Sequence, residues 1–168
     1  KGDLLALIGD TFVVQKNRFM HQQFDVAIVG GGIVGAATLY KLQKRNPDLR
    51  IVLFEKEAAL AAHQTGHNSG VIHSGLYYTP GSLKARNCVQ GRKELVQFCA
   101  EHGVDHDVCG KVVVATDKKE LPHMDRIFGI GQQNEIEGIE KITPSQVREI
   151  EPHVECIGGL WVPVTGIV

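Results

Sequence analysis

The stretch that decides the fold runs from Phe24 to Glu57 and reads FDVAIVGGGIVGAATLYKLQKRNPDLRIVLFEKE. A continuous apolar run, Val26–Val29, leads directly into three glycines, which predicts a parallel strand buried on both faces. A helix is predicted over Ile33–Arg45, and Asn46-Pro47 ends it because proline disfavours helical geometry in the residue before it. Ile51–Phe54 is the second predicted strand. The order strand, helix, strand indicates one βαβ unit.

The glycines fit the pattern GxGxxG, which is a weak signal alone. Here a strand enters the motif, a helix leaves it, and Glu55 ends the next strand about 20 residues after Gly35, as a dinucleotide site requires. We expect Gly30 to permit the tight turn, Gly32 to let a pyrophosphate approach, and Gly35 to let the helix pack closely. Glu55 is expected to accept hydrogen bonds from the adenosine ribose and to repel the 2′-phosphate of NADP. The alternative is a glycine turn with a surface glutamate.

A polar loop, HQTGHNSGVIHSGLYY, follows from His63 to Tyr78. It is too irregular for a helix and too polar for a buried strand. His63 and His67 have the spacing of metal ligands on a helix, but the residues around them interrupt any helix and no HExxH motif is present. We therefore predict no metal site.

The same loop favours FAD over NAD. Gly66 and Gly70 allow the backbone to approach a flat ring, and Thr65, Asn68 and Ser69 offer the neutral donors and acceptors that flavin phosphates, ribityl hydroxyls and ring edges need. The loop leaves the second strand near the carboxyl edge of the sheet, where ligands of open α/β folds bind.

These segments resemble a known family. EKEAALAAHQTGHNSGVIHSGLYYTPGSLKARNCVQG, CGKVVVAT, ITPSQVREIEP and IEPHVECIGGLWVPVTGIV are similar, in order and spacing, to the L-2-hydroxyglutarate dehydrogenase family. That family belongs to the superfamily of FAD-dependent oxidoreductases that includes D-amino-acid oxidase and glycerol-3-phosphate dehydrogenase. The resemblance extends from Phe24 to Val168.

The resemblance implies FAD-dependent oxidation of L-2-hydroxyglutarate to 2-oxoglutarate, with electrons passing to the quinone pool. It implies a mitochondrial location in an animal, associated with the inner membrane, and a cytoplasmic or membrane-associated one in a bacterium. Such enzymes are at least about twice as long, so this chain alone is not expected to be a competent catalyst. The alternatives are another superfamily member acting on an amino acid or on glycerol 3-phosphate, or a dinucleotide-binding fragment without turnover.

Site residues can be assigned by position from this resemblance. The expected cofactor-binding residues are Gly30, Gly32, Gly35, Glu55, Lys56, Thr65, Gly66, His67, Asn68, Ser69 and Gly70. His73 is the best candidate in the chain for the base that takes the hydroxyl proton, because a neutral imidazole accepts protons near neutral pH. The alternatives are that His73 only hydrogen-bonds the loop, or that the base lies elsewhere in a longer protein. Lys84 and Arg86 are candidate partners for the substrate carboxylates.

Beyond the loop, the sequence predicts further elements. Two strands are predicted, over Lys111–Thr116 and over Gly159–Pro163. A helix is predicted over Leu83–His102, with Ser82 as its N-cap and Gly103 at its end. A weaker helix over Leu121–Asn134 is expected to be broken by Gly129 and Gly131, and a short helix is capped by Thr143.

The predicted fold class is α/β (α+β overall): a Rossmann-like FAD-binding βαβ core, followed by the start of a substrate domain with a mixed or antiparallel sheet. We assign 1–23 to a disordered lead, 24–110 to the FAD-binding domain and 111–168 to the incomplete substrate domain. The chain has 168 residues, 43% of them apolar, and a formal net charge of -1, which points to neither nucleic acid nor an anionic membrane surface. No apolar run approaches the ~20 residues of a membrane span.

Overall fold

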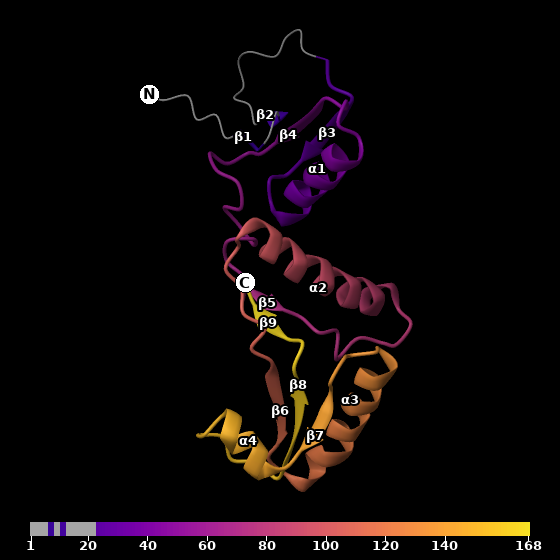
Figure 1. Ribbon diagram of the computed structural model, residues 1–168, viewed down its shortest axis with the longest axis vertical. Coiled ribbons are helices and arrows are strands. Elements are labelled where there is room, and N and C mark those ends of the chain that lie inside the picture. Colours follow the sequence, from indigo (N-terminus) through magenta and orange to yellow (C-terminus); the bar gives the residue numbers. More distant parts are fainter. Residues whose placement is uncertain (1–6, 9–10, 13–22) are drawn as a thin grey trace. The chain divides into compact units, whose positions relative to one another are not determined.

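The computed structural model describes residues 7–8, 11–12 and 23–168, and Figure 1 labels their helices and strands. The chain forms two compact units, Lys1–Ser69 and Gly70–Val168. In the predicted lead, β1 (Leu7–Ile8) pairs antiparallel with β2 (Thr11–Phe12). Its other residues up to position 22, for which disorder was predicted, lie outside the described residues. The functional division at position 110 stays a prediction.

The first unit contains the predicted βαβ arrangement. The strands β3 (Val26–Val29) and β4 (Ile51–Phe54) and the helix α1 (Ile33–Arg45) have the predicted bounds. β3 and β4 pair in parallel, with Val26 opposite Ile51. α1 packs on this pair through a buried cluster made by Leu39, Ile51 and Leu53. The α/β fold class is therefore confirmed.

One face of β3 is exposed, which corrects the prediction of a strand buried on both faces. Exposure alternates along β3, and Val29 is 86% exposed, whereas Ile51, Val52 and Leu53 of β4 are buried. A parallel strand is buried on both faces when helices cover both sides of its sheet. Among the described residues this sheet has two strands, with α1 packed against them.

The second unit combines two small antiparallel sheets with helices. The elements are β5 (Val71–Ile72), α2 (Leu83–His102), β6 (Lys111–Ala115), η1 (Lys118–Glu120), α3 (Leu121–Gln133), β7 (Glu140–Ile142), α4 (Pro144–Ile150), β8 (Gly158–Val162) and β9 (Gly166–Ile167). β8 lies between β6 and β7 in the larger sheet, and β5 pairs with β9 in the smaller one (Figure 1). None of the helices between positions 23 and 168 has the length and apolarity of a membrane-crossing segment.

The predicted helix caps of this unit are confirmed. The Ser82 hydroxyl accepts a hydrogen bond from the Ala85 N–H at the start of α2, and Gly103 ends that helix in the left-handed conformation, with φ of 65°. Thr143 caps α4 and forms a capping box with Gln146. The α2 and α4 boundaries were therefore readable from local chemistry.

Two predictions for this unit were wrong. α3 is not broken by its glycines: a side chain at Gly131 would put its Cβ 2.4 Å from Ile139, so this glycine serves close packing inside a continuous helix. The loop from His63 to Tyr78 also contains a strand, β5, whose Ile72 is 1% exposed. Its partner β9 is far away in the sequence, so local polarity did not reveal the pairing.

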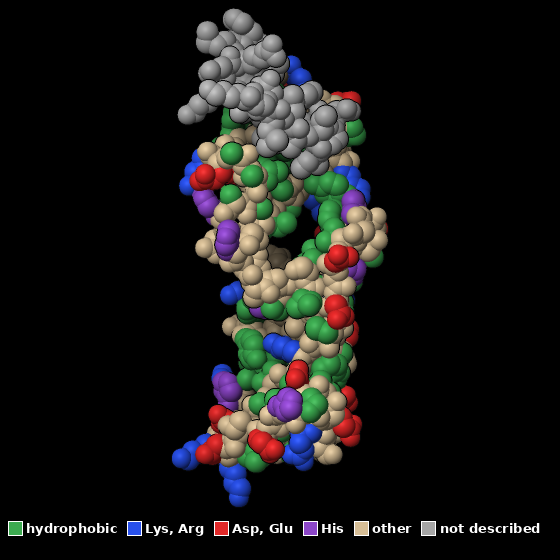
Figure 2. Space-filling view, turned by 90° about the vertical axis from the view of Figure 1, so that its left-hand side faces the viewer, with side chains coloured by type: hydrophobic (Ala, Val, Ile, Leu, Met, Phe, Trp, Pro, Cys, Tyr) green, Lys and Arg blue, Asp and Glu red, His purple; other side chains and the backbone are tan. Residues whose placement is uncertain are grey.

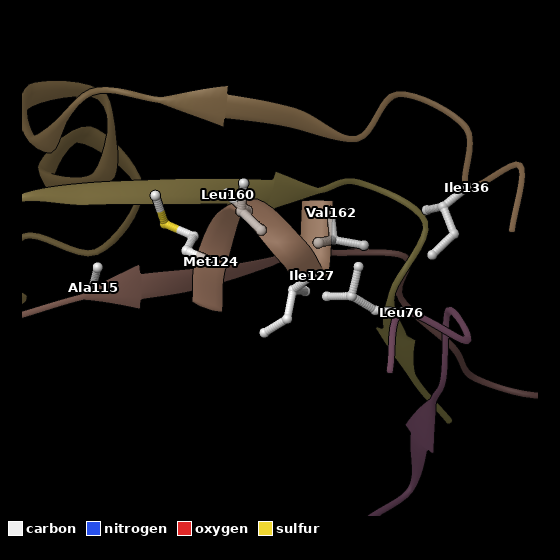
Figure 3. Close-up of a cluster of buried hydrophobic side chains, with 7 residues drawn as sticks. All are labelled: Leu76, Ala115, Met124, Ile127, Ile136, Leu160 and Val162. Atoms are coloured by element: carbon white, nitrogen blue, oxygen red, sulfur yellow. The ribbon is translucent and has the colours of Figure 1, made fainter. Parts of the chain in front are cut away.

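The core of the second unit anchors part of the polar loop. Figure 3 shows a loop residue, Leu76, which is 1% exposed, in one buried cluster with side chains from α3, β6 and β8. Just beyond α3, the buried Asn134 amide donates hydrogen bonds to the carbonyls of Gly75 at 3.1 Å and Tyr78 at 2.8 Å. The loop segment after His73 is therefore held both by the apolar packing of Leu76 and by the hydrogen bonds from Asn134.

A charge cluster joins α2 to the segment after α3. Glu137 accepts from Arg92 and from Lys93, each at 2.6 Å, and the Arg92 side chain is 8% exposed. Burial alone would raise the pKa of Glu137, but hydrogen bonds from Lys93, from its own backbone N–H and from Arg92, with the Arg92 charge, lower this pKa from 4.5 to about 2. A carboxyl group with a lowered pKa stabilises the fold when the pH is above the ordinary pKa of the group. This stability is lost as the pH falls through the pKa of the folded state.

We expect Glu137→Gln to lower the free energy of unfolding near neutral pH by about 1 kcal/mol, because solvent screens a carboxylate that keeps 47% of its side chain exposed. The difference from wild type should shrink as pH falls from 4.5 toward 2, the window of the shifted pKa. Thermal unfolding of the complete protein across this range measures it. Glu149→Gln, at an exposed position of α4, is the matched control. A difference that stays constant with pH would contradict the charge explanation.

Candidate functional site

The glycine motif lies between the end of β3 and the start of α1. Gly30 has φ of 102°, a conformation that side chains rarely allow, and its N–H donates to the Phe54 carbonyl at 2.8 Å. A Cβ at Gly35 would lie 1.9 Å from the Gly30 carbonyl oxygen. The tight turn and the close approach of helix to strand are thus the two features predicted for these glycines.

The N-terminus of α1 faces a residue of the polar loop. The N-cap is Gly32, which has no side chain to cap the helix, and the first turn contains no acid. Instead the Thr65 hydroxyl accepts a hydrogen bond from the Ile33 N–H at 2.9 Å, and a Cβ at Gly32 would lie 3.2 Å from that hydroxyl. A helix N-terminus without an acid attracts anions. Thr65, although distant in sequence, shares this end of the helix.

Glu55 is tied to the glycine motif by hydrogen bonds. Its Oε2 accepts from the Gly31 N–H at 2.6 Å, and its Oε1 accepts from the Glu57 N–H at 3.0 Å. The hydrogen bonds from the backbone of Glu57 and then of Gly31 hold the pKa of Glu55 below its ordinary value. A carboxylate has about four acceptor positions, so Glu55 retains acceptor capacity for hydroxyl groups while it orders the loop.

A cavity of about 380 Å³ opens beside these groups. It brings together five of the predicted cofactor-binding residues: Gly30, Gly32, Glu55, Lys56 and Thr65. The remaining lining residues, which sequence reasoning missed, are Val29, Phe54, Ala61, Ala62, His63 and Gln64. Among these six residues, only His63 was considered as a site residue from the sequence, because its spacing from His67 resembles that of two metal ligands on a helix. Its Nε2 lies 3.1 Å from Glu57 Oε1.

The other predicted cofactor residues do not line this cavity. Gly35 packs closely against the Gly30 carbonyl, as described above. His67 contacts the His63 carbonyl through its Nδ1 at 2.9 Å, and the Asn68 amide donates to the Thr65 carbonyl at 2.6 Å, so both fold the loop onto itself. Of the remaining members, Gly66 lies in the turn just before His67, and Ser69 and Gly70 lie just before β5, where Gly70 begins the second unit.

The candidate base lies in the second unit. His73 is exposed and directly follows β5, and its carbonyl accepts a hydrogen bond from the Cys88 thiol at 3.3 Å. Ser74 beside it is 2% exposed. The side chain of His73 therefore reaches solvent from a segment whose neighbours are buried.

The candidate substrate cations of α2 are both exposed. The ammonium of Lys84 lies 4.4 Å from the centre of the Tyr78 ring, and Arg86 is two residues further along the helix. In the part of the chain that the structure describes, no three His, Cys, Asp or Glu side chains are placed to hold a metal ion. The face seen in Figure 2 carries charges of both signs interspersed with hydrophobic side chains.

Glu55→Gln is expected to weaken FAD binding by about tenfold to a hundredfold, because an amide keeps the shape but loses the charge-assisted acceptor. In one of the two orientations of the glutamine amide, its NH₂ group would also face the Gly31 N–H, which needs an acceptor. Fluorescence titration of the apo form of the complete protein with FAD measures the affinity. Glu57→Asp, which retains a carboxylate near His63, provides a comparison at the neighbouring acid. Unchanged affinity in Glu55→Gln would make Glu55 a surface residue without a role in binding.

Comparison with known proteins agrees on one family. The family model for FAD dependent oxidoreductase (DAO) matches residues 25–168. The chain is 50% identical over 145 residues to L-2-hydroxyglutarate dehydrogenase of Indibacter alkaliphilus, which covers 86% of this chain and 36% of that protein. It is 46% identical over 145 residues to the mitochondrial L-2-hydroxyglutarate dehydrogenase of Homo sapiens, covering 86% of this chain and 31% of that protein. The chain therefore spans about a third of the length of these relatives.

A solved structure has a similar fold. The dithionite-reduced L-alpha-glycerophosphate oxidase from Mycoplasma pneumoniae, with FAD bound, superposes with a TM-score of 0.79 at 29% identity, covering 86% of this chain and 38% of that one. The match includes both compact units, since 86% of the chain exceeds either unit alone.

Proposed function

Because the chain belongs to the family of FAD-dependent oxidoreductases, we propose that the complete protein oxidises L-2-hydroxyglutarate to 2-oxoglutarate. The observation that carries this proposal is the similarity of 46–50% identity, over 86% of the chain, to bacterial and animal proteins named for that reaction. Identity to the glycerophosphate oxidase is 29%, so oxidation of glycerol 3-phosphate is the weaker candidate.

The residues of the first unit fit an FAD molecule. Gly32 has no side chain at the N-terminus of α1, where the first turn contains no acid, and this suits a pyrophosphate. The Glu55 carboxylate retains acceptor positions for ribose hydroxyls. Thr65 offers a hydroxyl at the same helix end, and Lys56 adds a cation at the cavity. When bound, FAD supplies the acceptor for the hydride that leaves the substrate. The chain's task in this unit is to bind the cofactor and orient it.

We assign the proton transfer to His73. The substrate loses a hydride from its hydroxyl-bearing carbon and a proton from the hydroxyl group, and a neutral imidazole can take that proton. Support comes from its exposed position on a backbone segment fixed by Leu76 and by the Asn134 hydrogen bonds. A fixed backbone limits the positions that the His73 imidazole can reach to those of its own side-chain rotamers.

The names of the relatives support one part of a proposed location, and the electron acceptor is a separate proposal. The animal relatives are named mitochondrial, which supports a mitochondrial location if this chain comes from an animal. We propose the quinone pool as the destination of the electrons. For a bacterial protein we propose a cytoplasmic or membrane-associated location.

A substrate scan tests the proposed activity. The complete protein is assayed with an artificial electron acceptor against L-2-hydroxyglutarate, its D-enantiomer, glycerol 3-phosphate and a set of amino acids. Turnover of L-2-hydroxyglutarate well above all the others is expected. A preference for an amino acid or for glycerol 3-phosphate would move the protein to another branch of the family.

A further inference from the structure

Lys111, the first residue of β6, has an unusual environment for a lysine. It is half-buried, and its ammonium lies 4.8 Å from the centre of the Tyr77 ring. Burial lowers the pKa of Lys111 below its ordinary value. Among the described residues no carboxylate lies within 4.0 Å of this ammonium, whereas Lys93 and Lys141 each pair with an acid at 2.6–2.7 Å. Burying a cation without an anion costs free energy, so this position suits an anionic ligand.

The backbone brings Lys111 to the same end of the second unit as the candidate base. β5 pairs with β9 so that Ile72, next to His73, is opposite Gly166. The neighbouring Thr165 carbonyl accepts a hydrogen bond at 2.8 Å from Gly110, which precedes Lys111. Two short backbone steps across strands therefore connect the chain at His73 with the chain at Lys111.

Tyr77 provides a second link between them. It lies four residues after His73 in the loop, inside a tight turn that the Tyr78 N–H closes by donating to the Gly75 carbonyl at 3.1 Å. Leu76 and the Asn134 hydrogen bonds hold this turn. Tyr77 is 57% exposed, and the contact of its ring with the Lys111 ammonium favours the position in which that charge lies next to the turn.

We propose that Lys111, resting on Tyr77, binds the distal carboxylate of a dicarboxylate 2-hydroxy acid whose hydroxyl faces His73. This inference rests on the proposed function and adds the residue that selects for the second acid group. The carboxylate next to the hydroxyl is common to all 2-hydroxy acids and must be held rigidly for hydride transfer, which favours a bidentate arginine. The distal group ends a flexible chain, and a compact ammonium on a flexible stem matches it.

The test compares L-2-hydroxyglutarate with its 5-amide, which has nearly the same shape but lacks the distal charge. In the complete FAD-loaded enzyme, Lys111→Met keeps the apolar stem on Tyr77 and removes the ammonium. We expect kcat/KM for L-2-hydroxyglutarate to fall by about tenfold to a hundredfold, mainly through KM, as for the loss of one charged hydrogen bond. For the 5-amide it should change less than about twofold. The conservative variant Lys111→Arg should keep most of the preference for the diacid. Lys118 is an exposed lysine of η1, and the control variant Lys118→Gln should keep all of this preference.

Equal losses on both substrates in Lys111→Met, or no loss on either, would overturn the inference. The wild-type enzyme provides a measurement that does not depend on any variant folding: it should prefer the diacid over the 5-amide by at least about tenfold. Equal use of the two by wild type would contradict a charge-selective site while leaving the proposed activity intact. A wild-type enzyme that oxidises neither compound would instead overturn the proposed function, and the role of Lys111 with it.

Discussion

Gly35→Ala in the complete protein is expected to weaken FAD binding by at least about a hundredfold, and oxidation of any substrate should be lost with the cofactor. The added Cβ would lie 1.9 Å from the Gly30 carbonyl oxygen. The oxygen belongs to the backbone and the position of a Cβ is set by the backbone, so no side-chain rotation relieves the clash. Relief requires α1 to move away from the end of β3, which displaces the helix N-terminus and the cavity beside it. FAD content after purification and a titration of the apo form measure the loss.

Gly91→Ala is the matched control. Gly91 lies inside α2, and a Cβ there meets no atom within 4 Å. Because alanine is the better helix former, this variant should be more stable by about 0.5–1 kcal/mol and bind FAD as wild type does. If Gly35→Ala also bound FAD normally, the close contact between helix and strand would not be needed for the cofactor site.

His73→Gln is expected to keep the FAD and to lower turnover of L-2-hydroxyglutarate by a factor of ~10²–10⁴, the usual effect of losing a general base. The glutamine side chain can still hydrogen-bond the loop but cannot accept the proton. The acidic limb of the pH–rate profile should disappear in the variant, which a purely structural role of His73 would not cause.

His153→Gln, a change of the same kind at an exposed position after α4, should leave turnover and its pH dependence unchanged. Loss of flavin colour in His73→Gln would mean that His73 supports the loop. Full activity would place the base in a part of the protein outside this chain.

Much of the first unit could be predicted because its signals are local. The apolar runs of β3 and β4, the glycines between β3 and α1, and Pro47 after the helix define all three elements. The spacing from the glycines to Glu55 indicated a dinucleotide site. It did not reveal that Glu55 accepts a hydrogen bond from Gly31, because that contact depends on how the loop closes.

The features that the sequence did not predict depend on contacts between residues that are distant in the sequence. β5 exists because β9, which lies near the end of the chain in sequence, pairs with it. Gly131 continues α3 because Ile139 packs against it. Lys111 was read only as the start of a strand, since nothing in its own segment indicates that the Tyr77 ring lies next to its ammonium. Tertiary contacts override local patterns at such positions.

The most direct test of the central claim is anaerobic reduction of the purified complete protein by L-2-hydroxyglutarate. We expect the protein to be yellow from bound FAD, and the absorbance of the oxidised flavin to bleach on addition of the substrate, with one 2-oxoglutarate formed per flavin reduced. A colourless protein that binds NAD instead would contradict the claim. So would a yellow protein whose flavin stays oxidised with L-2-hydroxyglutarate but bleaches with an amino acid or glycerol 3-phosphate.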